Sequence, residues 1–176
     1  MIRQSPWILA VFVAVWAGGM DWRYRRIPNW LTVSGLVVGM AVNTAVHGWP
    51  GLKSSLLGAG FGLLLLLPFV LIRALGAGDW KLTGALGAFL GPSLLTTVLI
   101  GSMFVAGAMA LALVIYKGRL RQTLRNIAHM LGAFLRLHLP GPEVSLDNPE
   151  SVKVPFGVAM ALTVVLCGVG RVLGAV

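Results

Sequence analysis

The feature that most constrains this fold is an apolar stretch from Leu82 to Tyr116, which contains no charged residue. A single helix over this stretch would be about 52 Å long, whereas the hydrocarbon core of a bilayer is only about 30 Å thick. The dipeptide Gly91-Pro92 interrupts the stretch and is a strong helix-breaking signal. We therefore predict two membrane-embedded helices here, a short one that ends near residue 90 and a longer one over about 93–116.

The rest of the chain repeats this pattern of apolar runs separated by turn residues. Further runs cover about residues 6–20, 30–46, 54–72 and 155–173. Only 11% of the 176 residues are charged, whereas a soluble domain of this size carries about 25%. The sequence therefore predicts an all-α integral membrane protein, a six-transmembrane helix bundle that forms a single membrane-embedded domain over residues 1–176.

Two segments allow other interpretations. The first run is also compatible with a signal peptide, because Arg3 precedes an apolar core, although no clean A-x-A site precedes Asp21. Residues 117–139 carry leucines at helical spacing with arginines largely on another face, which predicts an amphipathic helix at the membrane surface between spans 5 and 6. A loop rich in proline, glycine and acid continues to about residue 154.

The distribution of basic residues predicts the orientation of the chain. The net charge is +9, but the basic residues lie between apolar runs and form no separate module, so we exclude a nucleic-acid partner. Loops at 21–29, 73–81 and 117–154 fall on one side of a six-span bundle and hold eleven of the fourteen Lys and Arg residues. The positive-inside rule makes that side cytoplasmic and places both termini outside. The single cysteine, Cys167, provides neither an intrachain disulfide nor a cysteine pair for zinc, and we predict no metal and no cofactor.

Two acidic residues stand out from this apolar background. Asp21 and Asp79 are isolated among apolar segments at the predicted cytoplasmic boundary, and an acid in such a setting is a functional hypothesis by default. Two adjacent carboxyl groups can share one proton, so that one activates water while the other polarises a peptide carbonyl. Gly76 and Gly78 would allow the backbone beside Asp79 to bend closely around a substrate. Taken singly, Asp21 is also explained by pairing with Arg25, and Asp79 by capping a helix.

Three motifs carry a family resemblance. Asp21 is followed by Ile27-Pro28-Asn29; Gly76-Ala77-Gly78-Asp79 is followed by Lys81-Leu82 and the glycine- and alanine-rich stretch Gly84–Gly91; and Val154-Pro155-Phe156-Gly157 opens the last run. In this order they resemble the type IV prepilin peptidase family, membrane aspartic proteases of the GxGD class. The resemblance implies that Asp21 and Asp79 are the catalytic pair and that Gly76, Gly78 and Lys81 support the site. Lys81 either orients the Asp79 loop or extends its amine to the membrane surface, as lysines commonly do.

The resemblance also implies a substrate and a location. Such an enzyme removes the short basic leader of membrane-inserted prepilin or pseudopilin precursors at the cytoplasmic face of the bacterial inner membrane. The chain lacks the cysteine-containing insert of longer members, so it is similar to the short forms that serve Flp/Tad pili, and no methyltransferase activity is expected. Three acids, Glu143, Asp147 and Glu150, form a solvated loop or contact the basic leader. The alternatives to a peptidase are a proton-coupled membrane transporter and a non-catalytic secretion-assembly subunit. The sequence does not indicate an oligomeric state.

Overall fold

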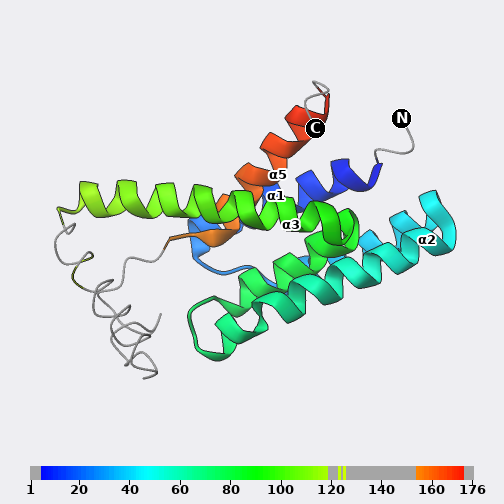
Figure 1. Cartoon of the computed structure of the whole chain (residues 1–176), viewed down its shortest axis with the longest axis horizontal. Helices are drawn as coiled ribbons and strands as arrows, with labels where there is room; N and C mark the ends of the chain where they lie inside the picture. The colour runs from blue at the N-terminus through cyan, green and yellow to red at the C-terminus, as the bar shows by residue number, and fades with distance from the viewer. Residues whose placement is uncertain (1–4, 119–122, 124, 126–153, 173–176) are drawn as a thin grey trace.

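The computed structural model describes residues 5–118, 123, 125 and 154–172 of the chain. Its helices in these ranges are α1 (Ser5–Tyr24), α2 (Asn29–Leu71), α3 (Ala77–Tyr116) and α5 (Phe156–Val172) (Figure 1). This arrangement confirms the predicted all-α class. Most of the predicted surface helix at 117–139, and the acidic loop with Glu143, Asp147 and Glu150, lie outside the described residues.

Two glycines divide the long helices where the sequence predicts breaks. Gly48 in α2 has φ 63° and ψ −146°, and Gly91 in α3 has φ 72° and ψ 174°. Side chains with a Cβ atom rarely adopt such positive φ values. Each long helix folds back on itself at its break (Figure 1), so the described residues form six helical rods that match the six apolar runs.

The break in α3 leaves backbone carbonyl groups that α2 satisfies. Pro92 has no N–H, so the Ala88 carbonyl lacks its usual helical donor. The Asn43 side-chain amide donates to the Ala88 and Phe89 carbonyls at 2.8 and 2.9 Å, and the Ser55 hydroxyl donates to Ala88 at 2.6 Å. Asn43 and Ser55 lie on the two halves of α2 and are both buried. Buried backbone groups are costly without partners, so these side chains stabilise the break from both sides.

The first half of α3 is the central rod of the bundle. Every residue from Leu82 to Gly91 is buried, and α1, α2 and α5 all pack against α3. Gly58 in α2 and Gly87 in α3 face each other so closely that a Cβ atom on either would collide with the other's backbone. Small residues permit this kind of backbone contact between membrane helices. Gly87, in the glycine- and alanine-rich stretch, therefore permits close helix packing at the central rod.

The outer surface of the bundle is apolar, as a lipid-facing surface must be. Helices α2 and α3 are each long and apolar enough to cross a bilayer. Many large apolar side chains are exposed on the described helices, among them Phe12, Trp16, Leu64, Phe69, Met103, Phe104 and Leu166. A soluble protein rarely exposes so much contiguous apolar surface. The chain is thus a helical membrane protein.

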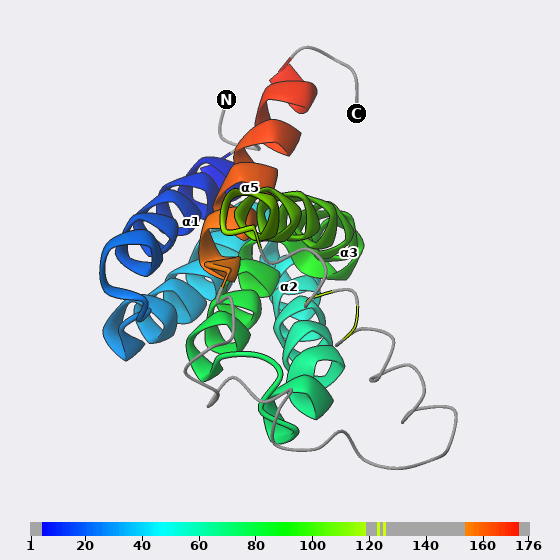
Figure 2. The ribbon, with the colours of Figure 1, turned by 90° about the vertical axis from the view of Figure 1, so that its left-hand side faces the viewer.

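The two ends of the bundle hold different parts of the chain. The α1–α2 connection, the α2–α3 connection and the start of α5 lie at one end, on the left of Figure 1 and facing the viewer in Figure 2. The start of α1 and the breaks at Gly48 and Gly91 lie toward the other end.

Helix α1 contributes the buried residues Ala10, Ala14 and Ala17 and packs mainly against α5. The first apolar run is therefore an integral helix of the bundle, which does not favour the signal-peptide interpretation.

We expect Asn43→Ala to lower the free energy of unfolding by about 1–3 kcal/mol, because it withdraws a donor from two buried carbonyl groups. Thermal or denaturant unfolding in detergent micelles measures the effect. Thr97→Ala is the matched control, since Thr97 is exposed and its hydroxyl contacts only its own helix. An Asn43→Ala protein as stable as the control would contradict this account of the break.

Candidate active site

Asp21 lies in the last turn of α1, at the end of the bundle that holds the connections. Arg25 follows the helix with a positive φ of 53°, and its N–H donates to the Asp21 carbonyl at 3.0 Å. This left-handed residue ends the helix in the manner of a C-terminal cap. Asp21 is only 8% exposed. The positive charge of Arg25 acts on its carboxyl group, but the protein also buries that group. The predicted pairing with Arg25 thus accounts for only part of its environment.

Asp79 lies in the first turn of α3, directly after the glycine-rich connection. Gly76 occupies the N-cap position with φ −69° and ψ 140°, and no side chain caps the helix. The alternative interpretation, in which Asp79 caps α3, is therefore wrong. A Cβ atom on Gly76 would lie 3.2 Å from Asp79 Oδ2, so glycine leaves room for the carboxyl group. The other oxygen, Oδ1, is buried and has no hydrogen-bond partner among the described residues.

The start of α5 brings the two acids together. The Gly157 backbone N–H donates to Asp21 Oδ2 at 3.0 Å, across 136 positions of sequence. The same amide faces the Asp79 carboxyl group, and the charge of Asp21 acts directly on Asp79. Three separate helix ends thus converge on one pair of carboxyl groups. The two acids therefore lie at the same end of the bundle.

Ile27 fills the space between the motifs. A Cβ atom on Gly78 would lie 3.3 Å from Ile27 Cβ, and one on Gly157 would lie 3.1 Å from Ile27 Cδ1. Ile27 is 8% exposed, so its side chain is held between the glycine-rich connection and the start of α5. Gly78 therefore permits close packing of two connections beside the acids, and no role in admitting substrate is needed to explain it.

Lys81 links the first two motifs directly. Its Nζ donates to Asn29 Oδ1 at 2.9 Å, across 52 positions of sequence. Asn29 begins α2 immediately after the α1–α2 connection, and Lys81 lies one turn into α3. Of the two predicted roles for Lys81, the geometry favours orientation of the Asp79 loop over simple extension to the surface.

Sequence reasoning missed two contributors to this site. It named the motif at residues 154–157, but assigned no role to the Gly157 amide or to the side chain of Ile27. A backbone donor has no residue-type signature, so only the resemblance of the motif pointed toward it. The three loop acids predicted to contact a leader lie outside the described residues. Within the described ranges, no cluster of three or more His, Cys, Asp or Glu side chains surrounds the acid pair.

A helical membrane protein that brings a buried and a half-buried carboxyl group together at one end has the functional groups expected of a membrane-embedded hydrolase. The model of the type IV leader peptidase family matches residues 7–111, which is more than half of the chain. The chain therefore belongs to the type IV leader peptidase family. The match includes both acids and ends before α5. No curated protein and no solved structure shows a significant match.

We expect Gly157→Ala to lower peptidase activity roughly tenfold to a hundredfold, because small displacements of reacting groups are costly. The new Cβ atom would lie 3.0 Å from Asp21 Oδ2 and 3.1 Å from Asp21 Cβ, so the carboxyl group must move. Cleavage of a prepilin substrate by the purified protein measures the change.

The control is Gly19→Ala, two positions before Asp21, where a Cβ atom would meet nothing within 4 Å. Unfolding curves for both variants separate a displaced carboxyl group from a damaged fold. If Gly157→Ala cleaves as well as Gly19→Ala, the start of α5 does not position the acids.

Proposed function

We propose that the chain is an aspartic endopeptidase that removes the short basic leader of prepilin-like precursors. Family membership supports peptidase activity of this general kind. The observation that carries the mechanism is the convergence of Asp21 and Asp79 beside the Gly157 amide. Two carboxyl groups in this arrangement are the functional groups that acid–base hydrolysis of a peptide bond requires.

The proposed reaction uses one proton shared by the pair. The ionised carboxyl group takes a proton from a water molecule, whose oxygen attacks the carbonyl carbon of the scissile peptide bond. The protonated carboxyl group donates its proton to the carbonyl oxygen, which gives a tetrahedral diol. Collapse of the diol returns that proton to its donor and breaks the C–N bond, while the leaving amine takes the proton removed from water. The pair titrates as one unit, so we assign base and acid to the dyad and not to individual residues.

The surroundings of the two carboxyl groups support a reaction at this pair. The Gly157 N–H donates a hydrogen bond to Asp21 Oδ2, and this bond holds the Asp21 carboxyl group in one orientation. The buried Asp79 Oδ1 has no hydrogen-bond partner among the described residues, although buried polar atoms in folded proteins are nearly always hydrogen-bonded. In the proposed reaction, this oxygen contacts the reacting water or the peptide carbonyl.

The proposed location follows from charge. The end of the bundle with the acid pair also carries Arg23, Arg25 and Arg26, so the positive-inside rule places it in the cytoplasm. Six crossings then leave both termini outside the bacterial inner membrane. The membrane-inserted precursor presents its leader on the cytoplasmic side, where Glu143, Asp147 and Glu150 supply negative charge for it. No methyltransferase activity is part of this proposal.

The alternative of a proton-coupled transporter receives no support from the described helices. A relay across the bilayer needs titratable groups at successive depths. Asp21 and Asp79 are the acids of the described residues, and both lie at the same end of the bundle. This placement fits chemistry at one membrane face.

We expect Asp21→Asn and Asp79→Asn each to reduce cleavage by about 10²–10⁴-fold, because an amide can neither take a proton from water nor donate an acidic one. The assay incubates purified protein with a prepilin in detergent and follows the shortened product. Lys53→Gln is the control, since it removes a charge from an exposed position on the second half of α2. Full cleavage by either asparagine variant would show that the two-carboxylate mechanism is wrong.

A further inference from the structure

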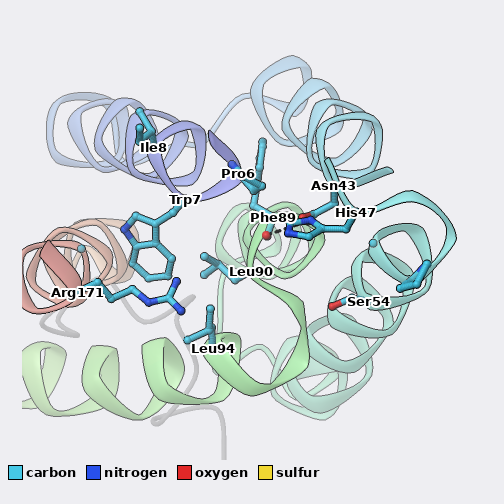
Figure 3. Close-up of a pocket in the computed structure, with 13 residues that line it drawn as sticks. Pro6, Trp7, Ile8, Asn43, His47, Ser54, Phe89, Leu90, Leu94 and Arg171 are labelled. Carbon is cyan, nitrogen blue, oxygen red and sulfur yellow. Dashed lines mark hydrogen bonds between the residues drawn. The ribbon is translucent and has the colours of Figure 1, made fainter. Parts of the chain in front are cut away.

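A second site lies at the end of the bundle remote from the acid pair. A cavity of about 770 Å³ is lined there by the start of α1, both halves of α2, the break in α3 and the end of α5 (Figure 3). This volume falls within the range of about 300–1,000 Å³ that is typical of small-molecule sites. Arg171 is fourteen positions beyond Gly157 along α5, which is about 21 Å along a helix. The cavity is therefore separate from the site of the proposed hydrolysis.

The cavity has an apolar wall and a basic rim. Phe89, Leu90 and Leu94, on both sides of the break in α3, form the apolar wall. Arg171 and His47 are exposed at the rim, from α5 and the first half of α2. Figure 3 shows the Arg171 side chain extending into the space between Trp7 and Leu94. A ligand that matched this lining would carry a negative head and an apolar tail.

Arg171 is oriented without an acidic partner from the described residues. Its guanidinium carbon lies 5.1 Å from the centroid of the Trp7 ring, which fixes the side chain by a cation–π contact. The acids of the described residues, Asp21 and Asp79, both lie at the other end of the bundle. Within the part of the chain that the structure describes, no carboxylate binds the fork of N–H donors, and phosphate is the external anion that its geometry matches best.

The depth of the cavity identifies the source of that phosphate. Helix α1 runs from Ser5 to Tyr24 and is about 30 Å long, the thickness of the hydrocarbon core. Trp7 is fourteen positions before Asp21, about 21 Å along α1. With the acid pair at one membrane face, Trp7 and Arg171 therefore lie in the opposite leaflet, where a long arginine side chain extends to the headgroups. Phosphate at this level belongs to phospholipids, and dissolved phosphate would leave the apolar wall unmatched.

We propose that this cavity binds one anionic phospholipid, with its phosphate on Arg171 and an acyl chain against Phe89, Leu90 and Leu94. The bound lipid joins the ends of α1 and α5 to the breaks in α2 and α3. It therefore stabilises the end of the bundle at which no interhelical connection other than the two breaks is present among the described residues. This inference does not depend on peptidase activity.

The test titrates lipids into the purified full chain in a neutral detergent and follows the thermal unfolding midpoint, with native mass spectrometry to count bound lipids. The probes are dioleoyl phosphatidylglycerol, dioleoyl phosphatidylcholine and inorganic phosphate. We expect phosphatidylglycerol to bind at least about tenfold more tightly than phosphatidylcholine, since hydrogen bonds to charged groups contribute at this level. Inorganic phosphate should give no stabilisation at the same concentration.

Variants assign the effect to the cavity. Arg171→Gln should reduce the affinity for phosphatidylglycerol to that for phosphatidylcholine, and Arg171→Lys should retain part of the preference. Lys53→Gln is the matched control, because Lys53 is exposed on α2 and is not part of the cavity lining. Leu94→Trp fills the apolar wall without removing the charge and should weaken the binding of both lipids, which tests the cavity even if Arg171→Gln does not fold.

Three results would overturn the proposal. Equal stabilisation of the wild type by the two lipids would remove the role of charge, and equal stabilisation by inorganic phosphate would remove the lipid. Unchanged binding in both Arg171→Gln and Leu94→Trp would place the lipid elsewhere on the apolar surface.

Discussion

The candidate site depends on one hydrogen bond, which the backbone N–H of Gly157 at the start of α5 donates to the Asp21 carboxyl group at the end of α1. The amide also faces Asp79 at the start of α3. Burial of a carboxyl group such as that of Asp21 is costly unless a donor faces it, and a free N–H at a helix start is such a donor. Helix α5 therefore does more than add apolar surface, because it fixes the position at which the other two helix ends meet.

The same physical constraint governs the remote end of the bundle. A break in a membrane helix exposes carbonyl groups that lipid cannot satisfy. Gly91 and Pro92 create such a break, and Asn43 and Ser55 supply the missing donors from the two halves of α2. The chain thus turns within the apolar layer without orphaned carbonyls at Ala88 and Phe89, and the turn leaves beside it the cavity that we assign to a lipid.

Local sequence signals predicted the helices and their breaks, whereas they did not predict contacts between residues far apart in the sequence. The breaks at Gly48 and Gly91 were predictable because glycine and proline act on their immediate neighbours. The charge pattern was sufficient to place Asp21 and Asp79 at one end. The contribution of Gly157 was not predictable, since every residue except proline has the same amide. The role of Asn43 was equally hidden, because a polar residue in an apolar run does not reveal its partner.

The central claim is that Asp21 and Asp79 face each other in the folded membrane protein. The most direct test replaces both with cysteine in a Cys167→Ser background and applies a short bifunctional thiol reagent to intact membranes, with mass spectrometry of the products. We predict a cross-link within one chain for this pair, and none for the pair at positions 21 and 53, which lie at opposite ends of the bundle. If both thiols at 21 and 79 react singly and no cross-link forms between them, the two acids do not share a site and the account is contradicted.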